Sequence, residues 1–247
     1  MKKIVSILMA LIMAGTLSAC GGNQESTEPT TVEKTTESKT ENENSLKPLE
    51  ILDFEYVATE ILEDQTIIHY GVKVKNPNPE HAVQFPVIYV TPKGYLGNDL
   101  YTQYATLSAI AAGDTIMYGG TVAYEGEEPA TVDVSVGSLD LSGGYILQEE
   151  STAIYQNELV VSDVSEQKYN DGKAVKFTGN VTNTSKYDID EKFVVSVVFF
   201  EDDKMIGGFC SYFENLKSGE TMPFELDLSY LIKELRNYDH YEIYVGQ

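Results

Sequence analysis

The chain contains two successive series of short β-type segments in the same order, and this repeat constrains the fold more than any other feature. The segments are rich in Val, Ile, Tyr and Phe, and clusters of Gly, Pro, Asn and Asp separate them. Three stretches of the first series align with three of the second at offsets of 107, 106 and 109 residues: 70–76 with 177–183, 110–115 with 216–221, and 134–137 with 243–246. The sequence therefore predicts two modules built on one plan.

Each module is expected to hold about six strands, at a spacing typical of an all-β sandwich. The expected strands lie near 49–58, 66–75, 84–91, 100–109, 114–123 and 130–137, and near 158–166, 173–182, 192–200, 205–213, 220–228 and 240–246. We place the modules at 48–141 and 157–247, with a polar linker at 142–156.

Turn and helix signals are local. Asn170-Asp171-Gly172 supplies residues that tolerate positive φ, as a tight hairpin requires. The triplets at 92–94 and 217–219 also predict turns. A single helix is expected over 229–238, with apolar residues on one face and Ser229 as its N-cap.

The amino end carries an export signal. Lys2 and Lys3 precede an apolar run over 4–14, which is too short to span a bilayer well. The following Leu17-Ser18-Ala19-Cys20 resembles the lipobox of bacterial lipoproteins. The resemblance implies that 1–19 is a cleaved signal peptide and that Cys20 carries a diacylglyceryl anchor. The expected location is the cell membrane, lipid-anchored at its extracytoplasmic face.

A polar segment follows the lipobox. Residues 20–47 contain six Glu and three Lys and almost no aliphatic side chains. Such a composition buries too little apolar surface to offset the entropy of ordering. We therefore expect a disordered tether between the anchor and the first module.

Charge and cysteine content exclude several classes of protein. Removing Lys2 and Lys3 leaves 15 basic against 39 acidic residues, a net charge of −24. Such a charge repels nucleic acid and anionic lipid, so we expect no nucleic-acid partner. The excess serves either solubility at a crowded surface or the binding of a cation or basic partner. With Cys20 lipidated, Cys210 has no partner for a disulfide and is expected to be a small apolar residue within a strand.

The second module carries a family resemblance. The relevant stretches are Gly-Asn-Val-Thr-Asn-Thr-Ser at 179–185, Val-Val-Phe-Phe-Glu-Asp-Asp at 197–203 and Asn-Leu-Lys-Ser-Gly-Glu-Thr at 215–221, followed by Phe224. They resemble the FxLYD domains of bacterial exported proteins, although Ser218 replaces a proline of that pattern. The resemblance implies that both modules are immunoglobulin-like β-sandwiches, and it carries no activity.

The search for chemistry yields few candidates. His69, His81 and His240 are isolated in sequence and match no zinc or protease spacing. No catalytic residue, cofactor-binding residue, metal ligand or cofactor is therefore predicted. The acidic turn Glu201-Asp202-Asp203 is the candidate interaction loop, because a sandwich presents its variable segments at its ends.

These observations favour a non-enzymatic cell-surface lipoprotein. It would bind an unknown protein or another envelope component and contact the membrane through the lipid on Cys20. Two alternatives stay open. One is a lipoprotein that captures a small solute or metal ion, and the other is an envelope enzyme whose site uses an acidic pair such as Asp188 and Asp190.

Overall fold

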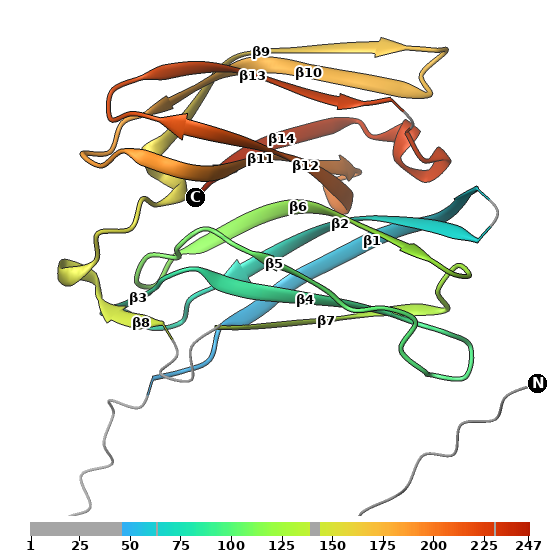
Figure 1. The fold of residues 1–247 in the computed structure, drawn as a ribbon, viewed down its shortest axis with the longest axis horizontal. Coiled ribbons are helices and arrows are strands. Elements are labelled where there is room, and N and C mark those ends of the chain that lie inside the picture. The colour runs from blue at the N-terminus through green and yellow to red at the C-terminus, as the bar shows by residue number, and fades with distance from the viewer. Residues whose placement is uncertain (1–45, 63, 139–143, 230) are drawn as a thin grey trace, which may run out of the picture. The chain divides into compact units, whose positions relative to one another are not determined.

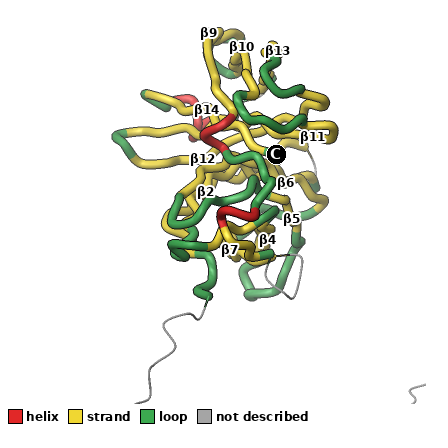
Figure 2. Tube along the Cα trace, turned by 90° about the vertical axis from the view of Figure 1, so that its left-hand side faces the viewer, coloured by secondary structure: helices red, strands yellow, loops and turns green. Residues whose placement is uncertain are grey.

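The computed structural model describes residues 46–62, 64–138, 144–229 and 231–247, which are mostly strand (Figures 1 and 2). The strands are β1 (Glu50–Leu62), β2 (Gln65–Lys75), β3 (His81–Val83), β4 (Pro86–Lys93), β5 (Gln103–Thr106), β6 (Thr115–Glu125), β7 (Thr131–Ser138), β8 (Tyr145–Leu147), β9 (Leu159–Tyr169), β10 (Ala174–Asn183), β11 (Ile189–Glu201), β12 (Lys204–Leu216), β13 (Thr221–Leu228) and β14 (His240–Gly246). The helical elements within these ranges are the short 3₁₀ helices η1 (Gln148–Glu150), η2 (Gln156–Glu158) and η3 (Lys233–Asn237). The predicted all-β class is confirmed.

The first series of strands forms two antiparallel sheets of three strands each. Their orders are β1-β2-β6 and β5-β4-β7, and β3 pairs with β8 in a small additional sheet. The two main sheets enclose a shared apolar core, whose buried members include Ile68, Tyr70, Val72, Ile88, Val90, Leu107, Ile116 and Val122. Two sheets packed over one apolar core form a sandwich.

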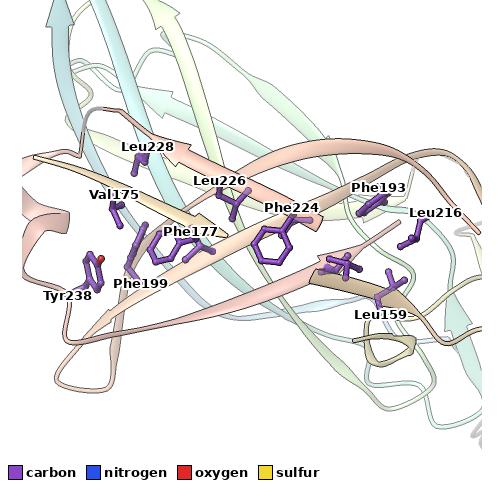
Figure 3. Close-up of a cluster of buried hydrophobic side chains, with 14 of the residues drawn as sticks. Leu159, Val175, Phe177, Phe193, Phe199, Leu216, Phe224, Leu226, Leu228 and Tyr238 are labelled. Atoms are coloured by element: carbon purple, nitrogen blue, oxygen red, sulfur yellow. The ribbon is translucent and has the colours of Figure 1, made fainter. Parts of the chain in front are cut away.

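The second series repeats this topology. Its sheets run β9-β10-β13 and β12-β11-β14. Taken in chain order, β9 to β14 therefore occupy the places of β1, β2, β4, β5, β6 and β7. The second core is rich in aromatic side chains, and Figure 3 shows Phe177, Phe199 and Phe224 together with the aliphatic residues around them. The repeat predicted from the sequence is therefore present in the order of the strands.

One buried asparagine in each series shows the same repeat at atomic level. Asn76 directly follows β2 and Asn183 ends β10, and both residues are buried. The Nδ2 group of Asn76 donates to the carbonyl of His81 at 2.6 Å, and that of Asn183 donates to the carbonyl of Tyr187 at 2.8 Å. Each Oδ1 accepts from the backbone N–H two residues later, at 3.1 and 3.0 Å. The two asparagines thus connect a strand end to the loop that follows it.

The two series also pack against each other within 46–247. Strand β12 contacts β1, β2 and β6, and β11 contacts β6, so sheet β1-β2-β6 lies against sheet β12-β11-β14 (Figure 1). Each of these two sheets therefore packs one face on the core of its own series and the other face on the sheet of the other series. This explains why β2 and β11 are buried along most of their length rather than at alternate positions.

Glycine permits the closest approach of these two sheets. A methyl group on Gly119 of β6 would collide with the carbonyl oxygen of Val197 in β11. A methyl group on Gly208 of β12 would lie 2.6 Å from the Cα atom of Gly119. The backbones of the two sheets therefore meet where neither residue has a side chain.

The turn predicted at 170–172 is confirmed, whereas the predicted helix at 229–238 is wrong. Asn170 and Asp171 have φ values of 51° and 55° between the paired strands β9 and β10. The second segment forms only η3, which begins after Ile232 rather than after Ser229. Leu231 donates its backbone N–H to the carbonyl of Lys173 at 2.6 Å, which fixes the segment to the β9–β10 hairpin. A run of ten residues gains too little from helix propagation to compete with such contacts.

The segment 142–156 carries structure of its own among its described residues. Its strand β8 pairs with β3, and the Gln148 side chain accepts from the N–H of Ala112 at 2.7 Å. A parallel bridge joins Ala109 and Tyr155. The connection between the two series is therefore fastened to the first series.

Candidate functional site

An open groove lies where the first and second series meet, beside the exposed aromatic side chains of Phe85 and Tyr212. We refer to it as the groove, and its volume is about 780 Å³. The residues that line it are Phe85, Thr106, Asp190, Glu191, Lys192, Phe193, Val194, Tyr212, Glu214 and Gln247. This size falls within the range of small-ligand sites, which span roughly 300–1,000 Å³. None of these residues belongs to the predicted interaction loop.

Two backbone irregularities shape the groove. Phe85, between β3 and β4, has a φ of 47°, an uncommon conformation for a bulky residue, and is 41% exposed. On the opposite side, the β11–β12 ladder shifts register between Ile189 and Lys192, and Asn215 of β12 has a φ of 60°. Such a bulge bends its strand and redirects side chains. Both irregularities therefore lie at the lining rather than in the cores.

The lining combines an apolar floor with exposed rings. Phe193 and Val194 are buried, and the ring of Phe193 stacks on Phe213 at 5.7 Å between centroids. Tyr212 is 57% exposed, and Phe85 is also exposed. The groove thus offers apolar contact area that is not covered by the rest of the chain.

The carboxylates of the groove differ in their partners. Asp190 accepts from the Lys217 ammonium group at 2.9 Å, and Asp188 lies 3.3 Å from the same nitrogen. Glu191 and Glu214 are exposed and, among the described residues, lie within ion-pair distance of no basic group. Within the described chain, neither carboxylate forms an ion pair, although Lys192 lines the same groove and lies opposite Glu214 in the β11–β12 ladder.

Asp188 and Asp190, the acidic pair considered for an enzyme, bind the neighbouring turn at 217–219. The N–H of Ser218 donates to Asp188 at 2.8 Å, and this bond together with Lys217 lowers the pKa of the Asp188 carboxyl. A carboxyl that serves as a general acid near neutral pH needs a raised pKa. Asp188 and Asp190 thus fasten the turn at 217–219 to the start of β11.

The predicted interaction loop is a tight turn at the other end of β11. Glu201 pairs with Lys204, and Asp202 and Asp203 between them have φ values of 52° and 60°, as expected for a two-residue hairpin turn. The N–H of Asp202 donates to Asp239 at 2.8 Å. The turn lies ~35 Å along the strand from Asp190, given about 3.3 Å per residue. It is exposed, as predicted, but it is separate from the groove.

The three histidines lie in three different surroundings. His69 is buried, and burial lowers its pKa to about 4. Its Nδ1 lies 3.1 Å from the hydroxyl of Thr121, beside a cavity of about 470 Å³ between β2, β6 and β12–β13. His240 stacks on Phe200 and pairs with Asp239 at 2.6 Å, whereas His81 lies in β3. In the part of the chain that the structure describes, no three His, Cys, Asp or Glu residues are grouped to hold a metal ion.

Cys210 lies in β12, as predicted, but it is only partly buried. Its sulfur lies 3.3 Å from the hydroxyl of Tyr118, in the contact between the two series. Burial raises the pKa of the thiol. Cys210 of the second series therefore packs against the core of the first series.

The lipidation site, Cys20, and the signal peptide lie outside the described residues, as does the tether apart from Leu46 and Lys47. Of the helices in the described ranges, none has the length and apolar character needed to cross a bilayer. The sequence did not single out Phe85, Tyr212 or Glu214, because each is distant along the chain from at least one of its neighbours in the groove. An aromatic residue before a proline, as at Phe85, was the only local signal.

Comparisons with known proteins identify no family. No protein-family model matches the chain, and no curated protein matches it. Three solved structures show distant likeness. Red sea bream transglutaminase has 8% identity and a TM-score of 0.24, with 76% of this chain and 28% of that chain covered. The exo-chitosanase CsxA of Amycolatopsis orientalis has 17% identity and a TM-score of 0.22, with 71% and 24% covered.

The third structure is the CBM22-1–CBM22-2 tandem domain of Xyn10C from Paenibacillus barcinonensis. It has 12% identity and a TM-score of 0.16, with 81% of this chain and 85% of that chain covered. The chain thus spans about a quarter of the length of the first two proteins. The class that the structure defines is an all-β protein with several small antiparallel sheets.

Proposed function

We propose that this chain is a lipid-anchored binding protein of the extracytoplasmic membrane face. In this proposal Cys20 carries the anchor, the tether extends from it, and two tandem immunoglobulin-like sandwiches of FxLYD type present the groove to a partner. The lipobox and the acidic tether composition support the anchored location. The repeated sheet order supports the tandem arrangement.

The groove is the observation that carries the binding role. It leaves Phe85 and Tyr212 exposed at 41% and 57%, beside the exposed carboxylates of Glu191 and Glu214, which form no ion pair with the described residues. Exposed rings next to unpaired charges are typical of surfaces that bind, because partners gain apolar contact and charge pairing at one place. Glu191, Tyr212 and Glu214 lie on the paired strands β11 and β12, and Phe85 lies in the short connection between β3 and β4. Groups carried on paired strands lose less conformational entropy on binding than groups on a free segment.

Photocrosslinking in cells tests this role. The full-length chain would carry a photoreactive phenylalanine analogue at Tyr212 and, as a matched control, at Val160, which is 46% exposed on β9 and away from the groove. We expect a discrete adduct from position 212 and none of the same mass from position 160. Equal labelling at both positions, or none at 212 in a folded and exported chain, would contradict a binding role for the groove.

The anchor has its own test. Cys20→Ala should abolish incorporation of an alkyne-bearing fatty acid and release the protein from the membrane fraction, because two acyl chains are what make anchoring stable. Cys210→Ala is the matched control and should keep the label. Label on the Cys20→Ala chain would show that the lipobox reading is wrong.

A further inference from the structure

We propose that the groove binds an extended peptide segment in which an arginine side chain is adjacent to an apolar residue. The inference rests on the proposed binding function and specifies the chemistry of the partner. The arginine would pair with Glu191 and Glu214, and the apolar residue would pack on the rings of Phe85 and Tyr212.

The charges of the groove favour a cation. Four carboxylates lie in or next to the lining, those of Asp188, Asp190, Glu191 and Glu214, against the two ammonium groups of Lys192 and Lys217. Lys217 is already shared by the two aspartates. Four carboxylates against two ammonium groups leave a local formal charge of −2, with Lys192 opposite Glu214 in the β11–β12 ladder. The whole chain adds a field of the same sign, with a formal charge of −22. A cationic side chain is therefore attracted both by the carboxylates of the groove and by the net negative charge of the whole chain.

The rings favour arginine over a compact ammonium group. Guanidinium is planar and weakly hydrated, stacks on aromatic faces and pairs with carboxylates through parallel N–H groups. Phe85 and Tyr212 supply exposed rings, and the glutamates supply the acceptors. The apolar floor of Phe193 and Val194 then suits an apolar neighbour of the arginine.

The other occupants fit less well. Residues 21–45 of the same chain hold six Glu and two Lys, so this segment brings charge of the wrong sign to the groove. A second copy would bring together two strongly acidic surfaces. A basic segment of another protein matches both the charge and the apolar surface.

Fluorescence anisotropy on the purified chain tests the inference. The protein would be the whole chain from residue 20 with Cys20→Ser, which removes only the lipid. The probe is a fluorescein-labelled decapeptide of alternating Arg and Val, and its matched control replaces each Arg by citrulline, which keeps the shape without the charge. We expect at least tenfold weaker binding of the citrulline peptide, and weaker binding of the Arg peptide as salt increases.

Variants then locate the binding. Combining Glu191→Gln with Glu214→Gln should weaken binding of the Arg peptide about tenfold, which corresponds to about 1.4 kcal/mol. The control combines Glu125→Gln with Glu128→Gln, which removes the same charge from exposed positions outside the groove. It should change affinity less than twofold. Tyr212→Ala should weaken binding and Tyr212→Phe should preserve it, with circular dichroism confirming that each variant is folded.

Three results would overturn the inference: equal affinity for the Arg and citrulline peptides, equal losses in the two double-glutamine variants, or a dimer of this chain whose contacts occupy the groove. If the peptide fails to bind while crosslinking at position 212 still gives a discrete adduct, the groove binds a partner of other chemistry. The binding function would then stand and the arginine inference would be wrong.

Discussion

The buried histidine of β2 makes the stability of the protein depend on pH in a defined direction. His69 is 1% exposed, and burial lowers its pKa from 6.5 to about 4, while a hydrogen bond with the Gly208 backbone acts in the opposite direction. Its neighbours around the cavity are Thr121 of β6, Phe209 of β12 and Asp227 at the end of β13. The folded state therefore holds a neutral imidazole in surroundings that disfavour its charged form.

The sign and size of the effect follow from proton linkage. Between about pH 6.5 and pH 4 the unfolded chain binds a proton at His69 that the folded chain does not, so acidification favours unfolding. The contribution of His69 is complete above pH 6.5 and decreases as the pH falls. From pH 7 to pH 5 the loss amounts to about 2 kcal/mol, given 1.36 kcal/mol for each pH unit of displacement.

Urea unfolding followed by far-ultraviolet circular dichroism measures this effect, since the sequence contains no Trp to report by fluorescence. The parent, His69→Gln and His81→Gln would be compared at pH 7 and pH 5 at one ionic strength. All other groups titrate in all three proteins, so the difference between pH dependences isolates the substituted histidine. We expect His69→Gln to lose about 2 kcal/mol less than the parent on acidification, and His81→Gln to follow the parent. If His69→Gln shows the parent's full loss, the buried neutral histidine is not the cause.

Three further predictions concern packing. Gly119→Ala should lower the free energy of unfolding by about 1–3 kcal/mol, because its methyl group meets the Val197 carbonyl. Gly137→Ala, with no heavy atom within 4 Å of the added carbon, is the control, and equal urea midpoints for the two variants would refute the sheet contact. Asn183→Ala should cost about 2–4 kcal/mol by leaving buried carbonyls unpaired, and a loss below about 0.5 kcal/mol would contradict that role. In a Cys20→Ser chain, Cys210 should react slowly with a disulfide reagent at pH 8 and at the rate of a free thiol in urea; equal rates would show that the thiol is open.

The strand pattern was predictable because each strand carries its own local signals. Turn residues with positive φ, such as Asn170 and Asp171, set the ends of β9 and β10 within a few residues of the expected limits. The repeat also located Asn76 and Asn183, which the structure places in equivalent roles. The resemblance to FxLYD domains and the lipidation of Cys20 stay predictions.

The groove and the sheet contact were not predictable from local signals. The groove combines Phe85 with Tyr212, which are 127 residues apart in the chain, and only the packing of the two series brings them together. The contact at Gly119 and Gly208 has the same origin. One signal was present, however: the unbroken apolar run from Val197 to Phe200 indicates a strand covered on both faces. The prediction of a helix at 229–238 was wrong because the same spacing of apolar residues also occurs in a loop that covers a sheet.

The contact between the two middle sheets has a consequence for how the protein is made. Synthesis proceeds from the amino end, so β1, β2 and β6 are complete at Glu125, whereas β12, which covers them, ends at Leu216. For about 90 residues of chain growth, the nascent protein displays an uncovered sheet face, a surface prone to aggregation. The interval places a demand on chaperones, and it is a window in which a mutation that slows β11 or β12 would reduce yield without altering the finished fold.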